Sequence, residues 1–220
     1  MLVEHRRNKI KELLLADKSV KVADLVARFA VSEETIRRDL NFLEEQGLVK
    51  KIYGGAILVD ELISTMEKIP PVQTRQSQFY QEKNAIGAKA LELVSEKQIV
   101  ILDAGTTTWC VAKHLKELTG MTFVTNGLNV AEECSKSDDS NVFLIGGKLI
   151  KKSMSLVGPQ AMNELQKYNA NIAFIGATGV SLEKGMTSSD IYEAEVKRAM
   201  VAAAQKVVIV ADHSKFERQG

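Results

Sequence analysis

Residues 31–41 combine an apolar helical stripe with a row of polar and basic side chains. Ile36 and Leu40 lie one helical turn apart and the stripe continues to Leu43, which predicts a helix with one buried face. Ser32 is suited to cap its first turn and, at the exposed start of the helix, is also a candidate for DNA contact. The outward side chains, of types that bond base edges and phosphates in the DNA major groove, are Thr35, Arg37, Arg38 and Asn41. A solvated surface helix is the alternative, and the flanking segments decide between the two.

The segments before this helix predict two more helices. Residues 3–16 carry an apolar stripe with basic residues between its members. Residues 22–29 carry apolar residues at i, i+3, i+4 and i+7. Residues 30–31 form a short turn before Ser32. Two short helices joined by such a turn indicate a helix-turn-helix unit.

The segments after the helix predict a β-hairpin. Residues 48–53 and 56–59 favour strands, and Gly54-Gly55 between them is a two-residue turn signal. Gly47 is placed to end the preceding helix. A winged helix-turn-helix domain over residues 1–58 follows. The residues on or near the wing that would contact DNA phosphates are Lys50, Lys51 and Tyr53, with a solvated lysine pair as the alternative.

The composition excludes several classes of protein. Hydrophobic residues make up 45% and charged residues 26%, as in an ordinary soluble globular protein, and the net charge of +1 gives no strong hint. No apolar run approaches the roughly 20 residues that span a bilayer, and no signal peptide is recognisable, so a cytoplasmic protein is expected. Cys110 and Cys134 lack metal-ligand spacing and the three histidines are scattered, so we expect reduced core thiols, no metal and no cofactor.

The rest of the chain predicts a linker and an α/β domain. Residues 59–80 contain the pair Pro70-Pro71 and little periodicity, which favours a linker with a short helix as an option at residues 60–67. Residues 81–220 alternate amphipathic helices with apolar strands, which predicts a mainly parallel sheet covered on both faces. The predicted strands are residues 99–102, 123–124, 142–145, 172–175 and 207–210, and the predicted helices are residues 82–95, 107–118, 128–136, 159–167 and 190–204. In the first of these helices, the residues expected to face inward are Ile86, Ala90, Leu93 and Val94.

A small polar loop follows each predicted strand. In open α/β sheets, ligands bind at the carboxyl ends of the strands, where these loops would converge. A glycine followed by three threonines at a helix start predicts a phosphate cradle, lysines add positive charge, and acidic or amide side chains could bond sugar hydroxyls. Each loop alone is compatible with a simple turn, and the common nucleotide-binding motifs are absent. The candidate ligand-binding residues are Asp103, Gly105, Thr106, Thr107, Thr108, Thr125, Asn126, Gly147, Lys148, Gly179, Asp190, Glu193 and Lys215.

Residues 33–40 (Glu-Glu-Thr-Ile-Arg-Arg-Asp-Leu) and residues 53–56 (Tyr-Gly-Gly-Ala) resemble the DeoR family of bacterial transcriptional repressors. Lys51 stands where the family commonly has arginine, and Tyr53 where it commonly has histidine. The lysine gives up bidentate phosphate geometry but keeps the charge.

The second half resembles the sensor domain of the same family. The matching segments are Glu82-Lys83, residues 103–108, Thr125-Asn126, Gly146-Gly147, Val157-Gly158 and residues 212–216. The resemblance implies a fold similar to ribose-5-phosphate isomerase and a phosphorylated sugar or sugar-like metabolite as effector, with the phosphate held by residues 105–108 and Lys215. It also implies a further terminal segment, so the chain ending at Gly220 is expected to be shorter than the family norm.

Three functions are compatible with these patterns. The leading hypothesis is a repressor of a carbohydrate-metabolism operon that binds operator DNA as a dimer or tetramer and is released by a sugar phosphate. The rival is a sugar-phosphate isomerase or deaminase fused to a DNA-binding head, but the loop at residues 176–181 has no carboxylate to act as a base. A third hypothesis makes the second domain purely an oligomerisation module.

Overall fold

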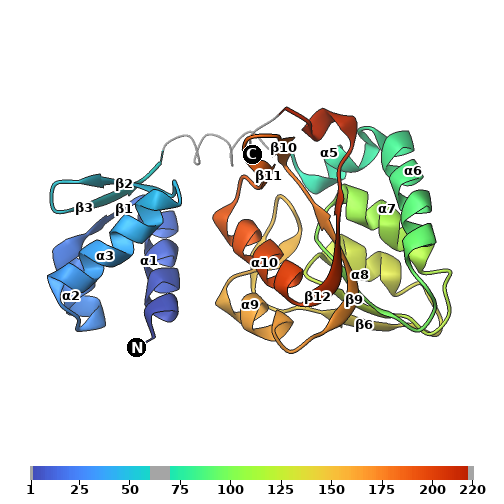
Figure 1. Ribbon diagram of the computed structural model, residues 1–220, viewed down its shortest axis with the longest axis horizontal. Helices are drawn as coiled ribbons and strands as arrows, with labels where there is room; N and C mark the ends of the chain where they lie inside the picture. Colours follow the sequence, from blue (N-terminus) through green and yellow to red (C-terminus); the bar gives the residue numbers. More distant parts are fainter. Residues whose placement is uncertain (1, 60–69, 218–220) are drawn as a thin grey trace. The chain divides into compact units, whose positions relative to one another are not determined.

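The computed structural model describes residues 2–59 and 70–217 and divides into two compact units, Met1–Lys68 and Ile69–Gly220 (Figure 1). The division falls within the predicted linker at residues 59–80, so the last residues of that linker belong to the second unit. These residues form helix α5 (Val72–Ser77) and the first residue of α6 (Tyr80–Ala90). The helix considered at residues 60–67 lies outside the described residues.

The first unit is the predicted winged helix-turn-helix domain. Helices α2 and α3 form the helix-turn-helix, and the sheet has the antiparallel order β1-β3-β2. Its elements are α1 (Val3–Asp17), β1 (Ser19–Lys21), α2 (Val22–Phe29), α3 (Glu33–Glu45), β2 (Val49–Ile52) and β3 (Gly55–Leu58). One core joins these elements, because the stripe residues Ile36, Leu40 and Leu43 of α3 pack with Ile10 of α1 and Leu25 of α2.

The wing differs from its prediction in two details. Ile52 pairs with Gly55, so the turn consists of Tyr53 and Gly54 and is shifted by one residue from the predicted Gly54-Gly55. Gly55 is needed for a different reason, because a Cβ there would lie 2.1 Å from the carbonyl oxygen of Val20. Val20 belongs to β1, a three-residue strand that was not predicted since it is too short to show alternation.

The second unit contains a five-stranded sheet in the order β12-β9-β4-β5-β6, with every neighbouring pair parallel, which confirms the predicted parallel sheet. The strands are β4 (Ile99–Leu102), β5 (Thr122–Thr125), β6 (Asn141–Leu144), β9 (Ala170–Gly176) and β12 (Ala204–Val210). Helix α6 and the short 3-10 helix η1 (Leu91–Leu93) precede β4. The helices between the strands are α7 (Thr106–Leu115), α8 (Leu128–Cys134), α9 (Pro159–Leu165) and α10 (Ile191–Ala202).

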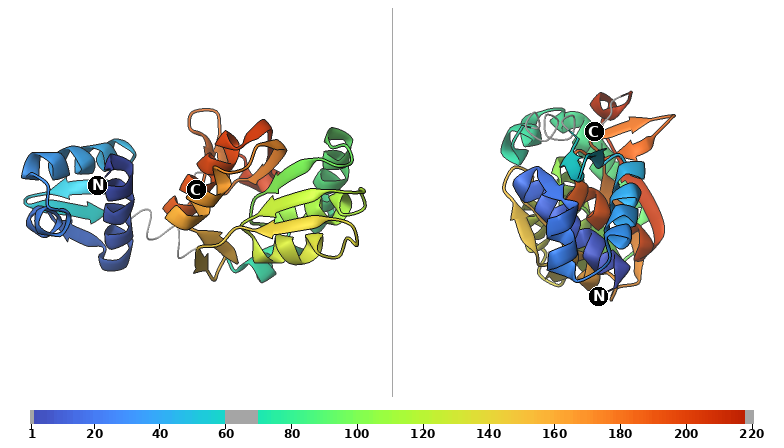
Figure 2. Two further views of the ribbon diagram at one scale, coloured as in Figure 1. Left: turned by 90° about the horizontal axis from the view of Figure 1, so that it is seen from below. Right: turned by 90° about the vertical axis from the view of Figure 1, so that its left-hand side faces the viewer.

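Helices cover both faces of this sheet (Figures 1 and 2). On one face α6, α7 and α8 pack on a core that includes Leu102, Phe123 and Phe174, whereas α9 and α10 lie on the other face. Leu93 was predicted to face inward, but the helix has tightened into the η1 turn there and the side chain is 41% exposed.

Two hairpins inserted between the main strands were not predicted. They are formed by β7 (Lys148–Ile150) with β8 (Ser155–Val157) and by β10 (Gly179–Ser181) with β11 (Gly185–Thr187). Each strand has only three residues, too few for a period to be recognised. The turn between β7 and β8 anchors α5, because the N–H of Val72 donates to the carbonyl oxygen of Lys152 over 2.7 Å.

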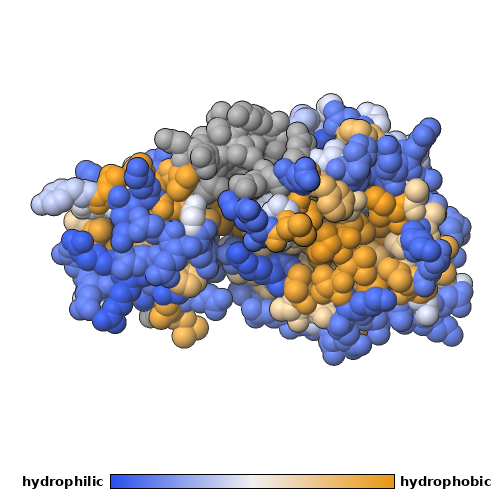
Figure 3. Space-filling model, turned by 45° about the horizontal axis from the view of Figure 1, so that its top comes forward, coloured by the Kyte–Doolittle hydropathy of each residue, from blue (hydrophilic) through white to orange (hydrophobic). Residues whose placement is uncertain are grey.

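Hydrophobic residues gather on part of the surface of the second unit (Figure 3). Both edge strands of its sheet expose large apolar side chains: Phe143 and Leu144 on β6, and Val207 and Ile209 on β12. None of the described helices is long and apolar enough to cross a membrane.

Candidate DNA-binding and effector sites

Helix α3 is called the reading helix below, because its outward side chains are predicted to contact DNA bases. It begins with a side-chain cap, as its sequence predicts. The Ser32 hydroxyl oxygen accepts a hydrogen bond from the N–H of Thr35 over 3.3 Å, and the two hydroxyls lie 2.8 Å apart. Glu33 and Glu34 occupy the first turn, where the helix dipole favours negative charge. Ser32 and Thr35 are therefore partly committed to holding the helix start.

Arg37 and Arg38 lie on the exposed side of α3. Each pairs with a glutamate one turn earlier, Arg37 with Glu33 at 2.6 Å and Arg38 with Glu34 at 2.5 Å, and their side chains remain 61% and 74% exposed. Exposed pairs of this kind contribute at most about 1 kcal/mol, so a phosphate or a base edge can replace the glutamate at little cost.

The wing is fastened to α3 by one lysine. The Lys51 ammonium donates to Oδ1 of Asn41 over 2.7 Å and lies 2.9 Å from Oε2 of Glu44. Asn41 therefore has its amide nitrogen and the second lone pair of its oxygen available for DNA. Lys50 and Tyr53 are exposed on β2 and at the turn, and neither lies in the core.

A buried ion cluster that the sequence did not reveal holds α1 against α3. Asp39 is 1% exposed and accepts from Nε of Arg6 over 2.6 Å and from Nε of Arg7 over 2.9 Å. The Arg7 guanidinium also lies 3.8 Å from the centre of the Phe42 ring. The only sequence signal was an acidic residue inside the polar row of α3, which a solvated position would explain equally well.

The start of α7 differs from that of α3, because no side chain caps it. Gly105 occupies the N-cap position with a φ of +155°, a conformation that L side chains rarely adopt. Thr106, Thr107 and Thr108 of the predicted cradle are buried, and the Thr108 hydroxyl has no hydrogen-bond partner in the described structure. A helix start with free N–H groups and an unsatisfied hydroxyl is suited to an anionic ligand.

The unsatisfied buried polar atoms share one location. In the described part of the chain, all side-chain atoms found in this state lie in loops and helix starts at the carboxyl edge of the main sheet. A buried polar atom without a partner costs about 1–3 kcal/mol, so a ligand or ordered water is expected to bond these atoms. They are Oγ1 of Thr108, Oδ1 of Asn129, Oγ of Ser188, Oγ of Ser189 and Oδ2 of Asp212.

Asp103 lies at this edge but is engaged within the protein. Its Oδ2 accepts from the buried Lys197 ammonium and from the N–H of Gly176. Burial raises the pKa of the Asp103 carboxyl, and the Lys197 charge opposes this rise. These bonds commit Asp103 Oδ2 to joining β4, β9 and α10, and binding of a sugar hydroxyl by this residue stays a prediction. Lys197 was missed because it lies in the middle of a helix.

Thr125 and Asn126 also hold the edge together. The Thr125 hydroxyl accepts from the N–H of Gly127. The Asn126 amide accepts from Ala104 N–H and donates to the Leu156 carbonyl. Both side chains are almost fully buried and shape the loops, and their contact with a sugar stays a prediction.

Four more of the predicted ligand-binding residues lie in hairpins or turns of the second unit. A Cβ on Gly147 would lie 2.4 Å from the carbonyl oxygen of Val157, and Gly179 pairs with Thr187 in the β10–β11 hairpin. Lys148 places its ammonium 5.2 Å from the centre of the Tyr192 ring. Lys215 is half-buried in the turn η2 (His213–Lys215) that follows β12.

The two acidic candidates lie at the start of α10. Asp190 caps this helix by accepting from the N–H of Glu193 over 3.0 Å, and burial raises the pKa of its carboxyl. Glu193 accepts a hydrogen bond from the Ser155 hydroxyl over 2.9 Å. The charge of Glu193 also acts on Asp103, so the structure brings these predicted residues together.

Two cations at this edge were not assigned a role from the sequence. Lys83 is 3% exposed, and its ammonium donates to the carbonyl oxygens of Arg75 and Gln78, which closes the end of α5. Burial lowers the pKa of Lys83, whereas the Asp212 charge opposes this. Burial likewise lowers the pKa of Arg75, and Glu193 opposes this. The Glu82-Lys83 motif was the available signal, and Arg75 lay in the presumed linker.

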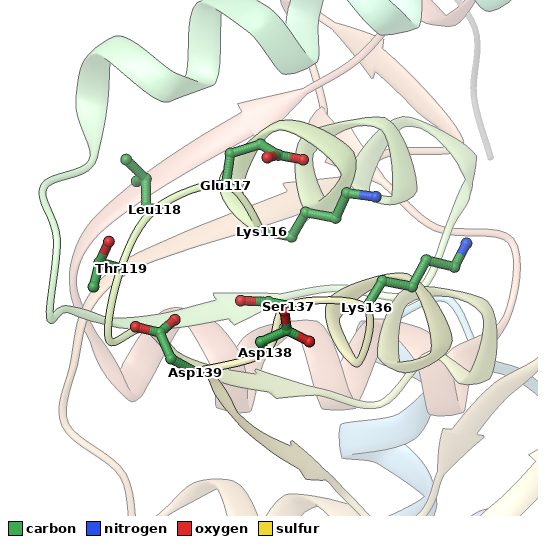
Figure 4. A pocket seen from close by; sticks show the side chains of 8 residues that line it. All are labelled: Lys116, Glu117, Leu118, Thr119, Lys136, Ser137, Asp138 and Asp139. Carbon is green, nitrogen blue, oxygen red and sulfur yellow. The ribbon is translucent and has the colours of Figure 1, made fainter.

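A different depression lies at the opposite, amino edge of the sheet (Figure 4). It is open to solvent, between the connections that lead into β5 and β6, and contains none of the predicted ligand-binding residues. The residues that line it are Lys116, Glu117, Leu118, Thr119, Lys136, Ser137, Asp138 and Asp139. Its two lysines already pair with the buried carboxylate of Glu133, so it offers no free cationic site.

Comparison with known proteins agrees with this two-part organisation. A family model described as "DeoR-like helix-turn-helix domain" matches residues 6–62, and one described as "DeoR C terminal sensor domain" matches residues 78–220. Among solved structures, the chain is similar to ribose 5-phosphate isomerase from Plasmodium falciparum (12% identity, TM-score 0.45, 62% of this chain and 52% of that chain). The corresponding isomerase A from Neisseria gonorrhoeae is similar at 20% identity and a TM-score of 0.45, over 61% of this chain and 52% of that chain.

Curated relatives extend over nearly the whole chain. The HTH-type transcriptional regulator IolR of Bacillus subtilis is 34% identical over 96% of this chain and 82% of its own length. The glycerol-3-phosphate regulon repressor of Escherichia coli K12 is 32% identical over 97% of this chain and 82% of its own length. With both family models and these relatives in agreement, the chain belongs to the DeoR family of transcriptional regulators.

Proposed function

We propose that the protein represses a carbohydrate-metabolism operon and leaves its operator when a phosphorylated sugar binds the second unit. The observation that carries the ligand part is the set of unsatisfied buried polar atoms at the carboxyl edge of the sheet, next to the buried Lys83 and the half-buried Arg75. A phosphate would accept hydrogen bonds from the free N–H groups of the α7 start. The hydroxyls of the sugar would form hydrogen bonds with the unsatisfied serine and threonine hydroxyls. One relative is itself named for the glycerol-3-phosphate regulon.

Release requires that the ligand discriminate between two states of the protein. The effector can lower DNA affinity only by as much as its own affinity differs between the DNA-bound and released arrangements. We propose a homo-oligomer, dimer or tetramer, in which two reading helices contact two operator half-sites. Besides this effector, the proposal includes no cofactor.

The experiment for the ligand is a thermal-shift screen against a panel of sugar and polyol phosphates, with tryptophan fluorescence as second readout. Trp109 is the single tryptophan and follows Thr108 directly, so its emission is expected to report on the site. Thr108→Val removes a hydroxyl that has no partner in the protein and is expected to abolish stabilisation by the ligand without unfolding the unit. Thr119→Val, the matched change in the depression at the amino edge, is expected to leave the shift unchanged. If no phosphate stabilises the wild-type protein, the second unit is an oligomerisation module instead.

The experiment for DNA uses a duplex selected in vitro by the wild-type protein from a random pool. Arg37→Ala and Arg38→Ala are each expected to weaken binding by about 1–3 kcal/mol if they contact bases. Because both arginines are exposed, the folded state should be nearly as stable as before. Unchanged affinity in both variants would reject this role of the helix.

An enzymatic function is the second candidate that the fold raises. Three carboxylates near the proposed site are already engaged: Asp103 with Lys197, Asp190 with the α10 start, and Glu193 with Ser155. Asp212 holds Ser214 through Oδ1, whereas its Oδ2 has no partner among the described residues. A general base must be free to take up a proton, so of these four carboxylates only Asp212 qualifies, and we propose a non-catalytic role for the second unit. Turnover of pentose or hexose phosphates that is lost in Asp190→Ala or Glu193→Ala would reverse this conclusion.

A further inference from the structure

Arg7 on α1 has surroundings that neither a structural ion pair nor a solvated side chain explains fully. Its Nε is fixed by Asp39 at 2.9 Å and its guanidinium plane is fixed by the Phe42 ring at 3.8 Å. The side chain is 24% exposed, and its two terminal nitrogens have no hydrogen-bond partner among the residues that the structure describes. One edge of a rigid guanidinium is thus left open.

The charges around Arg7 do not balance. Asp39 is the one carboxylate in the cluster, and it serves both Arg6 and Arg7. Arg6 is almost fully buried, with a side-chain exposure of 6%, so the excess positive charge is accessible only at Arg7. An immobilised guanidinium with a free edge is the geometry that binds phosphate bidentately and with little loss of entropy.

The position of Arg7 relative to α3 suits the DNA backbone. Arg38 and Phe42 are four residues apart and are therefore neighbours on the surface of α3. Because Arg7 lies over the Phe42 ring, it is placed on the same side of α3 as Arg38. Asn41, which contacts Lys51 of the wing, projects about 100° away from Phe42. Helix α3 consequently has a cation on each flank, which suits a major groove about 12 Å wide with a phosphate strand on either side.

We propose that Arg7 binds a backbone phosphate of duplex DNA, with Asp39 and Phe42 acting as positioning residues that hold its guanidinium. This inference rests on the proposed DNA-binding function and adds a contact outside the recognition helix and the wing. Because a phosphate carries no sequence information, the contact adds affinity for every duplex and fixes the register of α3.

The test compares binding of the full-length protein to the selected duplex and to a scrambled duplex of equal length, over a series of KCl concentrations. Arg7→Gln is expected to weaken binding to both duplexes by a similar factor, about tenfold, and to lower the slope of log K against log salt by about one per DNA-binding head. Arg7→Lys keeps the charge but loses the fixed plane, so it should restore the slope and only part of the affinity. Lys9→Gln removes the same charge from the same helix at a site paired with Glu12, and should change neither quantity.

The outcomes separate this inference from the function on which it rests. If the wild-type protein selects no duplex, the DNA-binding function itself fails. If the wild type binds but Arg7→Gln retains the full salt slope, Arg7 is only structural and the proposal is overturned, whatever the loss of affinity. Phe42→Leu keeps both arginines and serves if Arg7→Gln does not fold: it should weaken binding with the slope preserved, and unchanged affinity would contradict the positioning role.

Discussion

The two units use charged side chains in opposite ways. On α3 the arginines that face outward pair with glutamates four residues earlier and stay more than half exposed. At the sheet edge of the second unit, Lys197 and Asp103 pair across 94 residues of sequence and are both buried. The first arrangement lets each arginine exchange its glutamate for DNA. The second holds in place the loops and helix starts that carry the unsatisfied polar atoms. The same contrast separates the helix starts, since α3 has its own side-chain cap and α7 has none.

The largest expected effect breaks the buried pair. Lys197→Met should lower the free energy of unfolding of the second unit by about 3–5 kcal/mol, because it leaves the Asp103 carboxylate buried without its cation. Urea unfolding followed by Trp109 fluorescence measures this. Arg38→Ala, which removes an exposed pair, should cost at most about 1 kcal/mol in unfolding monitored by circular dichroism.

A double variant controls for the loss of packing. Asp103→Asn combined with Lys197→Met removes both charges and retains an oxygen for the N–H of Gly176, so it should recover most of the lost stability. A Lys197→Met protein as stable as Arg38→Ala would erase the distinction between the two units.

The next effect concerns the start of α7. Gly105→Ala should destabilise the second unit by about 1–3 kcal/mol, because a φ of +155° is strained for any residue with a Cβ. The added methyl would also lie 3.3 Å from the Thr108 hydroxyl, so ligand-induced stabilisation should fall as well. Urea unfolding with and without the best phosphate from the screen measures both quantities. An alanine variant as stable as the wild type would show that this turn can relax.

The matching change at α3 should be smaller. Ser32→Ala removes the cap and should cost about 1 kcal/mol, whereas Ser32→Gly should cost only a few tenths. Thermal unfolding of the three proteins by circular dichroism gives the comparison. Equal stability of Ser32→Ala and wild type would mean that the helix start is held by packing, for example through Val31 and Ile36, and not by its cap.

The sequence predicted the elements of both units because their stripes are long and periodic. Ile36, Leu40 and Leu43 set the inward face of α3, and the apolar runs around Leu102 and Phe174 set the buried strands. The three-residue strands escaped prediction since no period can be read from three positions. For the candidate sites, the sequence predicted where they lie in the fold but not which side chains pair within them. Pairings such as Asp39 with Arg6 and Asp103 with Lys197 join residues far apart in the chain, so no local pattern announces them.

The smallest expected effect is the pH-dependent loss of stability caused by the buried carboxyl of Asp190 at the sheet edge. Because burial raises the folded-state pKa of Asp190 above its unfolded value, its favourable contribution is complete below the unfolded pKa, about 3.9, and is lost as pH rises through the folded pKa. Asp190→Asn keeps the cap oxygen without the charge, so its stability relative to the wild type should rise with pH across this window. Unfolding free energies from about pH 3 to pH 7 provide the measurement. Asp190→Ala should be less stable than Asp190→Asn at every pH by about 1 kcal/mol, because it lacks the cap. A stability difference between Asn and wild type that stays flat or falls with pH would mean that Lys148 and the helix start compensate the buried charge fully.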